Sequence, residues 1–349
     1  MACARSSPVW ISFVLWLANV LAAAACQVPV FRYALERWAP AEYLVTITPS
    51  QSGLTEAEKK AVEALRSARR DTANPVNLEI QNEPPVSGTP GSAQLTLHYP
   101  RKLRDTRKPP VWQTPLSEEA VQRLIDSPVR RELRRRLLAG ESAIWLLVES
   151  GEPTKDDAAF KALSQALAGA ESSLKLPDGV LTPEESAKLS GSRANAKAET
   201  LRFDLPLKIA FSIVRVQRND PEEVALLAML THLEEDLGEY AREPMVFPVF
   251  GRGRVLEPLV GAGINQGNVI EHSGYLCGAC SCEVKDQNPG IDLLIAANWE
   301  PVDTTPQLEV IRISAAAEAP PARRPPVLAL SAIAISLGFG AWLLLRRSS

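Results

Sequence analysis

Three cysteines lie within six residues near the end of the chain, in the sequence CGACSC at residues 277–282. Cys277 and Cys280 form a C-x-x-C pair, and Cys282 follows two residues later. Thiols at this spacing can form a disulfide, exchange electrons with another dithiol, or bind a soft metal ion as thiolates. The cluster is therefore the strongest candidate site in the sequence.

A fourth cysteine, Cys26, directly follows an apolar N-terminal segment. Arg5 precedes an apolar run over residues 8–25, and the run ends in alanines at the positions that signal cleavage requires. Residues 1–25 are therefore predicted to be a signal peptide, which would remove Cys3 and leave Cys26 at the start of the exported chain. Two alternatives stay open: an uncleaved membrane anchor, and lipidation of Cys26.

Four cysteines in an oxidising compartment allow three kinds of site. The first is a structural disulfide, either within the cluster or between Cys26 and the cluster. The second is a redox-active Cys277–Cys280 pair, which would have a lowered thiol pKa if it stood at a helix start. The third is a Zn(II) or Cu(I) site formed by Cys277, Cys280 and Cys282, with His272 as the fourth ligand. The sequence leaves these three open.

Other chemistry has little support in the sequence. The chain has no G-x-S-x-G, H-E-x-x-H or phosphate-loop sequence, so we predict no catalytic residue and no cofactor apart from the metal alternative. The formal charge of −3 gives no reason to expect nucleic acid as a partner. Five arginines at residues 130–136 are predicted to lie on a solvated helix face paired with Glu132 and Glu141, or to contact anionic lipid.

A second apolar segment, residues 327–345, ends at Arg346 and Arg347. As a helix it would be about 28 Å long, which matches the hydrocarbon thickness of a bilayer. We predict a single transmembrane helix with a cytoplasmic tail at residues 346–349, preceded by a stalk rich in proline and alanine at residues 306–326. A C-terminal sorting signal is an alternative. Most of the chain is expected on the periplasmic, extracytoplasmic side of the cell membrane.

Between these segments, predicted strands alternate with helices. Apolar runs at residues 43–48, 143–149 and 245–250 predict strands, and Thr55 with Glu58 predicts a capping box at the start of a helix. Such alternation predicts an α/β fold in two halves with mainly parallel sheets. We place an N-terminal domain at residues 26–173, a flexible linker at 174–200, and a C-terminal domain that carries the cysteine cluster at 201–305.

Two resemblances follow from these residues. The string CGAC resembles the active-site motif of thioredoxin-like proteins, which implies that fold and a redox role, although no apolar strand precedes Cys277 and Cys282 is extra to the motif. Residues 26–38 (CQVPVFRYALERW) and 276–299 (LCGACSCEVKDQNPGIDLLIAANW) resemble signatures of a family of exported, membrane-anchored envelope proteins. The second resemblance implies a location and no activity.

Together these features predict a membrane-anchored, extracytoplasmic binding or assembly module whose partner is another envelope protein. Support comes from the anchor, the stalk and the large α/β region. The alternative is a thiol–disulfide redox protein, or a protein that handles Zn or Cu, acting through the cysteine cluster.

Overall fold

The computed structural model describes residues 27–85, 91–101, 109–189, 199–280 and 283–300. The expected signal peptide, stalk and C-terminal helix lie outside these residues, as do Cys26 and Cys282. Within them, no helix is long and apolar enough to cross a membrane. The described residues all belong to one compact unit, Met1–Val302.

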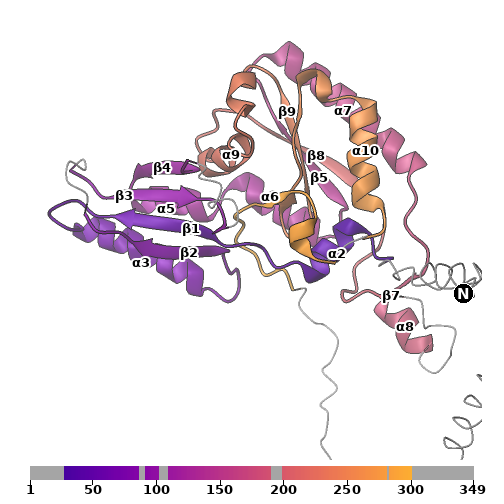
Figure 1. The fold of residues 1–349 in the computed structure, drawn as a ribbon, viewed down its shortest axis with the longest axis horizontal. Helices are drawn as coiled ribbons and strands as arrows, with labels where there is room; N and C mark the ends of the chain where they lie inside the picture. Colours follow the sequence, from indigo (N-terminus) through magenta and orange to yellow (C-terminus); the bar gives the residue numbers. More distant parts are fainter. Residues whose placement is uncertain (1–26, 86–90, 102–108, 190–198, 281–282, 301–349) are drawn as a thin grey trace, which may run out of the picture. The chain divides into compact units, whose positions relative to one another are not determined.

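The first of two main sheets has four strands in the order β2-β1-β3-β4 (Figure 1). β1 pairs with β2 in parallel, whereas β3 is antiparallel to both β1 and β4. The capping box of Thr55 and Glu58 forms as predicted and starts α3. The elements are β1 (Tyr43–Thr48), α3 (Glu56–Arg70), β2 (Leu78–Asn82), β3 (Gln94–His98), β4 (Trp112–Pro115) and α5 (Glu118–Ile125).

The second sheet has six strands, with β12-β10-β9-β5-β8 in order and β11 beside β9. β5 and β8 are parallel, and β9 is antiparallel to β5 on its other side. The elements are β5 (Ala143–Val148), α7 (Pro153–Ser173), β8 (Phe211–Val216), α9 (Val224–Thr231), β9 (Met245–Phe250), β10 (Arg254–Val255), β11 (Leu259–Val260), α10 (Gln266–Cys277) and β12 (Ile291–Asp292).

The two sheets share one topology. Each begins with a parallel β-α-β unit, formed by β1-α3-β2 in the first and β5-α7-β8 in the second. In each sheet the next strand (β3 or β9) is antiparallel to the first strand and lies on the side opposite the second strand. A hairpin partner (β4 or β10) and then a helix (α5 or α10) follow it. In each sheet the crossover helix packs beside the last helix, α3 against α5 and α7 against α10.

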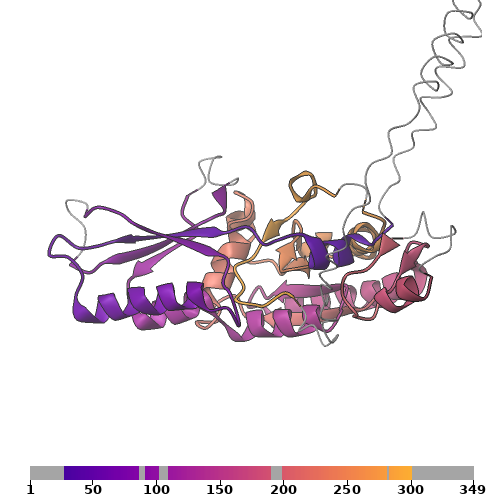
Figure 2. The same ribbon diagram turned by 90° about the horizontal axis from the view of Figure 1, so that it is seen from below.

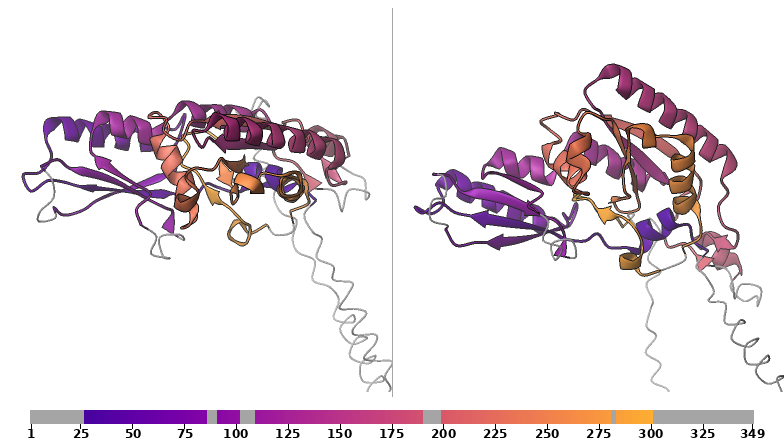
Figure 3. Two further views of the ribbon diagram at one scale, coloured as in Figure 1. Left: turned by 90° about the horizontal axis from the view of Figure 1, so that it is seen from above. Right: turned by 45° about the horizontal axis from the view of Figure 1, so that its top comes forward.

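The faces of the two sheets are covered differently. Figure 2 and the left view of Figure 3 show α3 and α5 on one side of the first sheet, below β1 to β4 in Figure 2. Val45 and Leu97 face these helices, whereas Thr46 and Thr96 lie on the opposite face. In the second sheet, α7 and α10 cover one face and α9 covers the other, so β5 and β9 are buried along their whole length.

Smaller elements join the sheets. α2 (Val30–Arg37) precedes β1, and α6 (Pro128–Leu138) precedes β5. Between α7 and β8 the chain forms β6 (Val180–Leu181), α8 (Pro183–Leu189) and β7 (Glu199–Thr200), and β6 pairs with β7 in parallel. Single turns of 3-10 helix lie at η2 (Leu237–Tyr240), η3 (Gly261–Gly263) and η4 (Lys285–Gln287).

Two expectations are corrected. The α/β class is confirmed, but the sheets are mixed, because antiparallel pairs outnumber the parallel pairs β1–β2 and β5–β8 in both. The expected boundary at residues 174–200 does not separate the sheets, since β5 lies before it and pairs with β8 and β9 after it. One continuous hydrophobic core contains residues of both sheets, including Val45 of β1 and Leu146 of β5.

Candidate functional site

The cysteine cluster begins at the end of the last long helix. Cys277 is the final residue of α10, and both Cys277 and Cys280 are buried. Just beyond the helix, the chain runs antiparallel to the N-terminal segment. The Val30 amide donates to the Gly278 carbonyl at 3.0 Å, and the Cys280 amide donates to the Val28 carbonyl at 3.0 Å. The structure therefore places the predicted N-terminal signature directly beside the predicted C-terminal one.

This placement does not suit thiol exchange at Cys277. The redox hypothesis required a cysteine at a helix start, where the helix dipole favours the thiolate. Cys277 instead lies at the carboxyl end of α10, where the dipole favours cations, and it forms no disulfide with any described residue. Burial raises the pKa of Cys277 to about 12, so the thiol stays protonated at neutral pH. A protonated, buried thiol is a poor nucleophile.

His272 lies on the same helix as Cys277 but on another side. Five residues along an α-helix correspond to about 140° of rotation and about 7.5 Å of rise, so the two side chains leave the helix in different directions. The His272 ring bonds the Asn268 carbonyl through Nδ1 at 2.9 Å, and its Nε2 is 3.7 Å from a Glu257 oxygen. This geometry does not favour His272 and Cys277 as ligands of one metal ion. No group of three or more metal-binding side chains occurs among the described residues.

The same region contains three buried polar atoms that lack hydrogen-bond partners within the described part of the chain. They are Trp145 Nε1 on β5, and His272 Nε2 and Ser273 Oγ on α10. The Trp145 and His272 rings are 6.4 Å apart between centroids. An unpaired buried donor or acceptor costs about 1–3 kcal/mol, so native proteins keep few of them. Sequence reasoning did not find Trp145 or Ser273, because nothing in their local sequence indicates burial without a partner.

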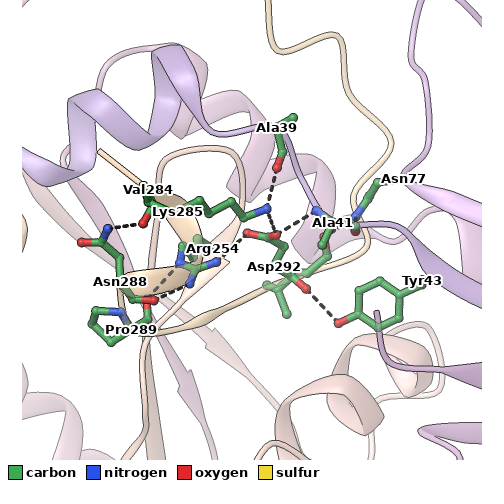
Figure 4. A network of polar contacts seen from close by, with 11 residues as sticks. Ala39, Ala41, Tyr43, Asn77, Arg254, Val284, Lys285, Asn288, Pro289 and Asp292 are labelled. Atoms are coloured by element: carbon green, nitrogen blue, oxygen red, sulfur yellow. Dashed lines mark hydrogen bonds and ion pairs between the residues drawn. The ribbon is translucent and has the colours of Figure 1, made fainter. Parts of the chain in front are cut away.

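The segment after the cysteines is fixed by a charged network around Asp292 (Figure 4). The Asp292 carboxylate accepts from the Ala41 amide at 2.8 Å and pairs with Arg254 at 3.3 Å and with Lys285. The Tyr43 hydroxyl donates to the Asp292 carbonyl at 2.9 Å. Because Tyr43 belongs to β1 and Asp292 to β12, this network ties the first sheet to the second.

A polar cleft of about 520 Å³ lies at the carboxyl ends of the parallel strands β5 and β8. This is the edge where α/β sheets commonly bind ligands. Here, however, the Asp156 carboxylate accepts from the Ser150 amide at 2.6 Å and from the Gly151 amide at 3.1 Å. Arg215 pairs with Glu149 at 2.6 Å. The groups that would bind an anion are thus already paired within the protein.

A second cavity, of about 530 Å³, lies next to the polar cleft, and Arg218 lines both. Its lining is largely apolar and comes from α9, from the segment after it, and from Tyr99 and Pro109 of the first half of the chain. Figure 1 shows α9 between β4 and β9, so the cavity lies where the two sheets meet. Cavities of this size between structural units commonly bind ligands. The sequence did not predict it, because it is formed by residues far apart in the chain.

Comparisons with known proteins give no relative. No family model matches the chain, and no curated protein and no solved structure is significantly similar to it.

Proposed function

We propose that the protein is a membrane-anchored, extracytoplasmic binding or assembly module, with its partner another protein of the cell envelope. The observation that carries this proposal is the largely apolar cavity between the two sheets, which adjoins a polar cleft whose charged groups are already paired. A preformed apolar cavity beside fixed polar groups is typical of a recognition site. The predicted signal peptide and C-terminal helix would place this site outside the cytoplasm.

We also propose that the two sheets are tandem units of thioredoxin-like topology. In that fold, a parallel β-α-β unit is followed by an antiparallel hairpin on the other side of the first strand, and both sheets follow this order. The cysteine pair of such a unit would stand between its first strand and first helix. Residues 149–152 occupy that position in the second unit with the sequence ESGE, and residues 49–55 occupy it in the first with PSQSGLT. Neither turn contains cysteine.

These observations favour recognition over thiol exchange. The C-x-x-C pair lies at the far end of α10, and the pKa of Cys277 is raised by burial. A Zn or Cu site that uses Cys277, Cys280 and Cys282 stays an alternative prediction, as does a disulfide that involves Cys26. The pairing of residues 28–30 with 278–280 is consistent with a structural role of the cysteines in holding the two ends of the exported region together.

The proposal is tested by photocrosslinking in intact cells. A photoreactive amino acid at the exposed Tyr240, beside the cavity, should give a discrete adduct with an envelope protein. The matched control is the same amino acid at the exposed Glu63 of α3, which should give none. Equal adducts at both positions, or no adduct at Tyr240, would contradict the proposal. The predicted topology places Ser349 in the cytoplasm. A reporter enzyme that works only in the cytoplasm should therefore be active when it is fused after Ser349.

A further inference from the structure

The cavity between the two sheets has an apolar floor. Leu227 of α9 and Leu237 of η2 are buried and line it, and Ala228 and Ala241 line its sides. Tyr240, in the same segment, is one of three large apolar side chains that are exposed among the described residues. Exposed aromatic surface beside an apolar cavity is typical of a protein interaction site, because such surface is stabilised when a partner covers it.

The rim of this cavity is acidic. Glu234 and Glu235 line it, and Asp236 and Glu239 are exposed in the same segment. None of these four carboxylates forms an ion pair with a described residue, whereas Glu149 of the neighbouring cleft pairs with Arg215. Burial raises the pKa of Tyr99, which lines the same cavity, and the negative charge of Glu234 adds to this rise.

Arg218, the one arginine among the described residues that line the cavity, does not pair with these acids. The Arg218 guanidinium donates to the Glu149 carbonyl at 3.2 Å and to the Glu243 carbonyl at 2.8 Å. Its partners are thus backbone atoms on the side of the polar cleft. Within the described part of the chain, the cavity therefore combines an apolar floor with carboxylates at its mouth that form no ion pair.

We propose that this cavity binds a peptide segment of a partner protein in which large apolar side chains stand next to Lys or Arg. This inference rests on the proposed binding function and specifies its ligand class. The apolar side chains occupy the floor at Leu227 and Leu237, and the basic side chains pair with Glu234 and Glu235 at the rim. Charge of one sign at the mouth of a site also steers oppositely charged ligands to it.

The test uses full-length protein in detergent and three fluorescent decapeptides that differ only in their central residues. The Leu-Leu-Lys-Lys peptide should bind, whereas the Leu-Leu-Glu-Glu and Ser-Ser-Lys-Lys peptides should bind at least about tenfold more weakly. Detergent alone serves as the blank for each peptide. Affinity for the first peptide should fall as salt concentration rises, because the rim charges are exposed.

Two double variants locate the site. Glu234→Gln with Glu235→Gln should weaken binding of the Leu-Leu-Lys-Lys peptide by about 3- to 30-fold. The matched control, Glu56→Gln with Glu63→Gln on the exposed face of α3, should leave it unchanged. Ala241 is exposed and lines the cavity, so Ala241→Trp should fill the cavity and block binding without disturbing the core. Equal binding of all three peptides, or no effect of the rim variant, overturns the proposal.

The chain itself contains an alternative occupant. The basic side chains of Lys102, Arg104, Arg107 and Lys108 lie outside the described residues, in the segment between the cavity-lining Tyr99 and Pro109. If the peptide binds only after these four residues are replaced by serine, the chain's own segment is the occupant and the proposal is wrong. If the peptides fail while the Tyr240 crosslink persists, the ligand class is wrong but the binding function stands.

Discussion

The two sheets follow the same order of strands and helices, yet helices cover their faces differently. In the first sheet, β1 presents Val45 to α3 and α5, and presents Thr46 to a face that no described helix covers. At the corresponding positions in the second sheet, β5 has Trp145 facing α7 and α10, and Leu146 facing α9. The strand sequences match this difference in coverage. The β1 sequence YLVTIT alternates in part between apolar and polar residues, whereas the β5 sequence AIWLLV is apolar throughout.

The difference has one structural cause. Between the second and third strands, the second sheet has α9, whereas the corresponding connection in the first sheet runs from β2 to β3 with no helix among its described residues. A helix at this place covers the second face and makes polar side chains there costly. It also supplies much of the wall of the apolar cavity. The helix that distinguishes the second sheet from the first therefore also lines the candidate binding cavity.

The largest expected effect is the loss of the network that joins the two sheets. Asp292→Ala leaves Arg254 and Lys285 without their buried carboxylate, which should lower the free energy of unfolding by about 3–5 kcal/mol. Denaturant unfolding of the full-length protein, followed by tryptophan fluorescence, measures this change. Glu257→Gln, which alters an exposed carboxylate, should change it by less than about 0.5 kcal/mol. A loss below about 1 kcal/mol for Asp292→Ala would mean that the two sheets are held together by other contacts.

The second prediction concerns Cys277, at the end of the last helix of the second unit. Its pKa rises from an ordinary value of 9 to about 12, so the thiolate fraction at pH 8 should be about a thousandfold lower than for a free thiol. Iodoacetamide should modify Cys277 only after denaturation, as mass spectrometry of the digested protein will show. Rapid alkylation of the folded protein would restore the redox hypothesis.

The same shift predicts the direction of a pH effect on stability. The folded-state pKa of Cys277 lies above the unfolded-state pKa, so the unfolded state releases the thiol proton first as pH rises. This contribution to stability is present below about pH 9 and is lost between about pH 9 and 12. Cys277→Ala should flatten this part of the stability profile relative to the unsubstituted protein. Identical profiles would show that the thiol does not titrate in this range.

The third prediction exchanges residue types between corresponding positions of the two sheets. Leu146→Thr should cost about 3 kcal/mol, because it removes apolar volume beneath α9 and buries a hydroxyl. Thr46→Val should change stability by less than about 1 kcal/mol, since its main loss is the contact of Thr46 Oγ1 with His98 Nε2 at 3.3 Å. Thermal unfolding of the two variants measures both effects. Similar costs would mean that the two sheets do not differ in the way described.

The sequence predicted most local elements and few of the long-range relations. β1, β5 and β9 lie where the apolar runs placed them, and the Thr55–Glu58 capping box forms as expected. The parallel-sheet prediction was wrong, because a fully apolar strand such as β9 shows only that both faces are covered and not the direction of its neighbours.

The candidate site was less predictable, for related reasons. The prediction of a solvated arginine face is wrong at Arg130, which is buried and donates hydrogen bonds to the Leu124 and Leu294 carbonyls. The other arginines of the same helix are at least partly exposed. Local spacing also cannot show that Cys277 ends a helix rather than begins one. The cavity depends on Tyr99 lying next to α9, and no local pattern indicates a contact between residues so far apart.

The smallest expected effect tests the unpaired polar atoms between β5 and α10. Ser273 is fully buried and its hydroxyl has no hydrogen-bond partner among the described residues. Ser273→Ala removes that unpaired group and improves helix propensity, so it should stabilise the protein by about 0.5–1.5 kcal/mol. Ser172→Ala, at an exposed position of α7, gains the same propensity term and loses only the hydrogen bond from its hydroxyl to the Gly169 carbonyl, so it serves as the control in the same thermal unfolding experiment. If Ser273→Ala is instead destabilising while the control is not, the hydroxyl has a bound partner such as an ordered water. The second unit would then contain an internal polar site beside Trp145, whereas the corresponding β1 position holds the apolar Val45.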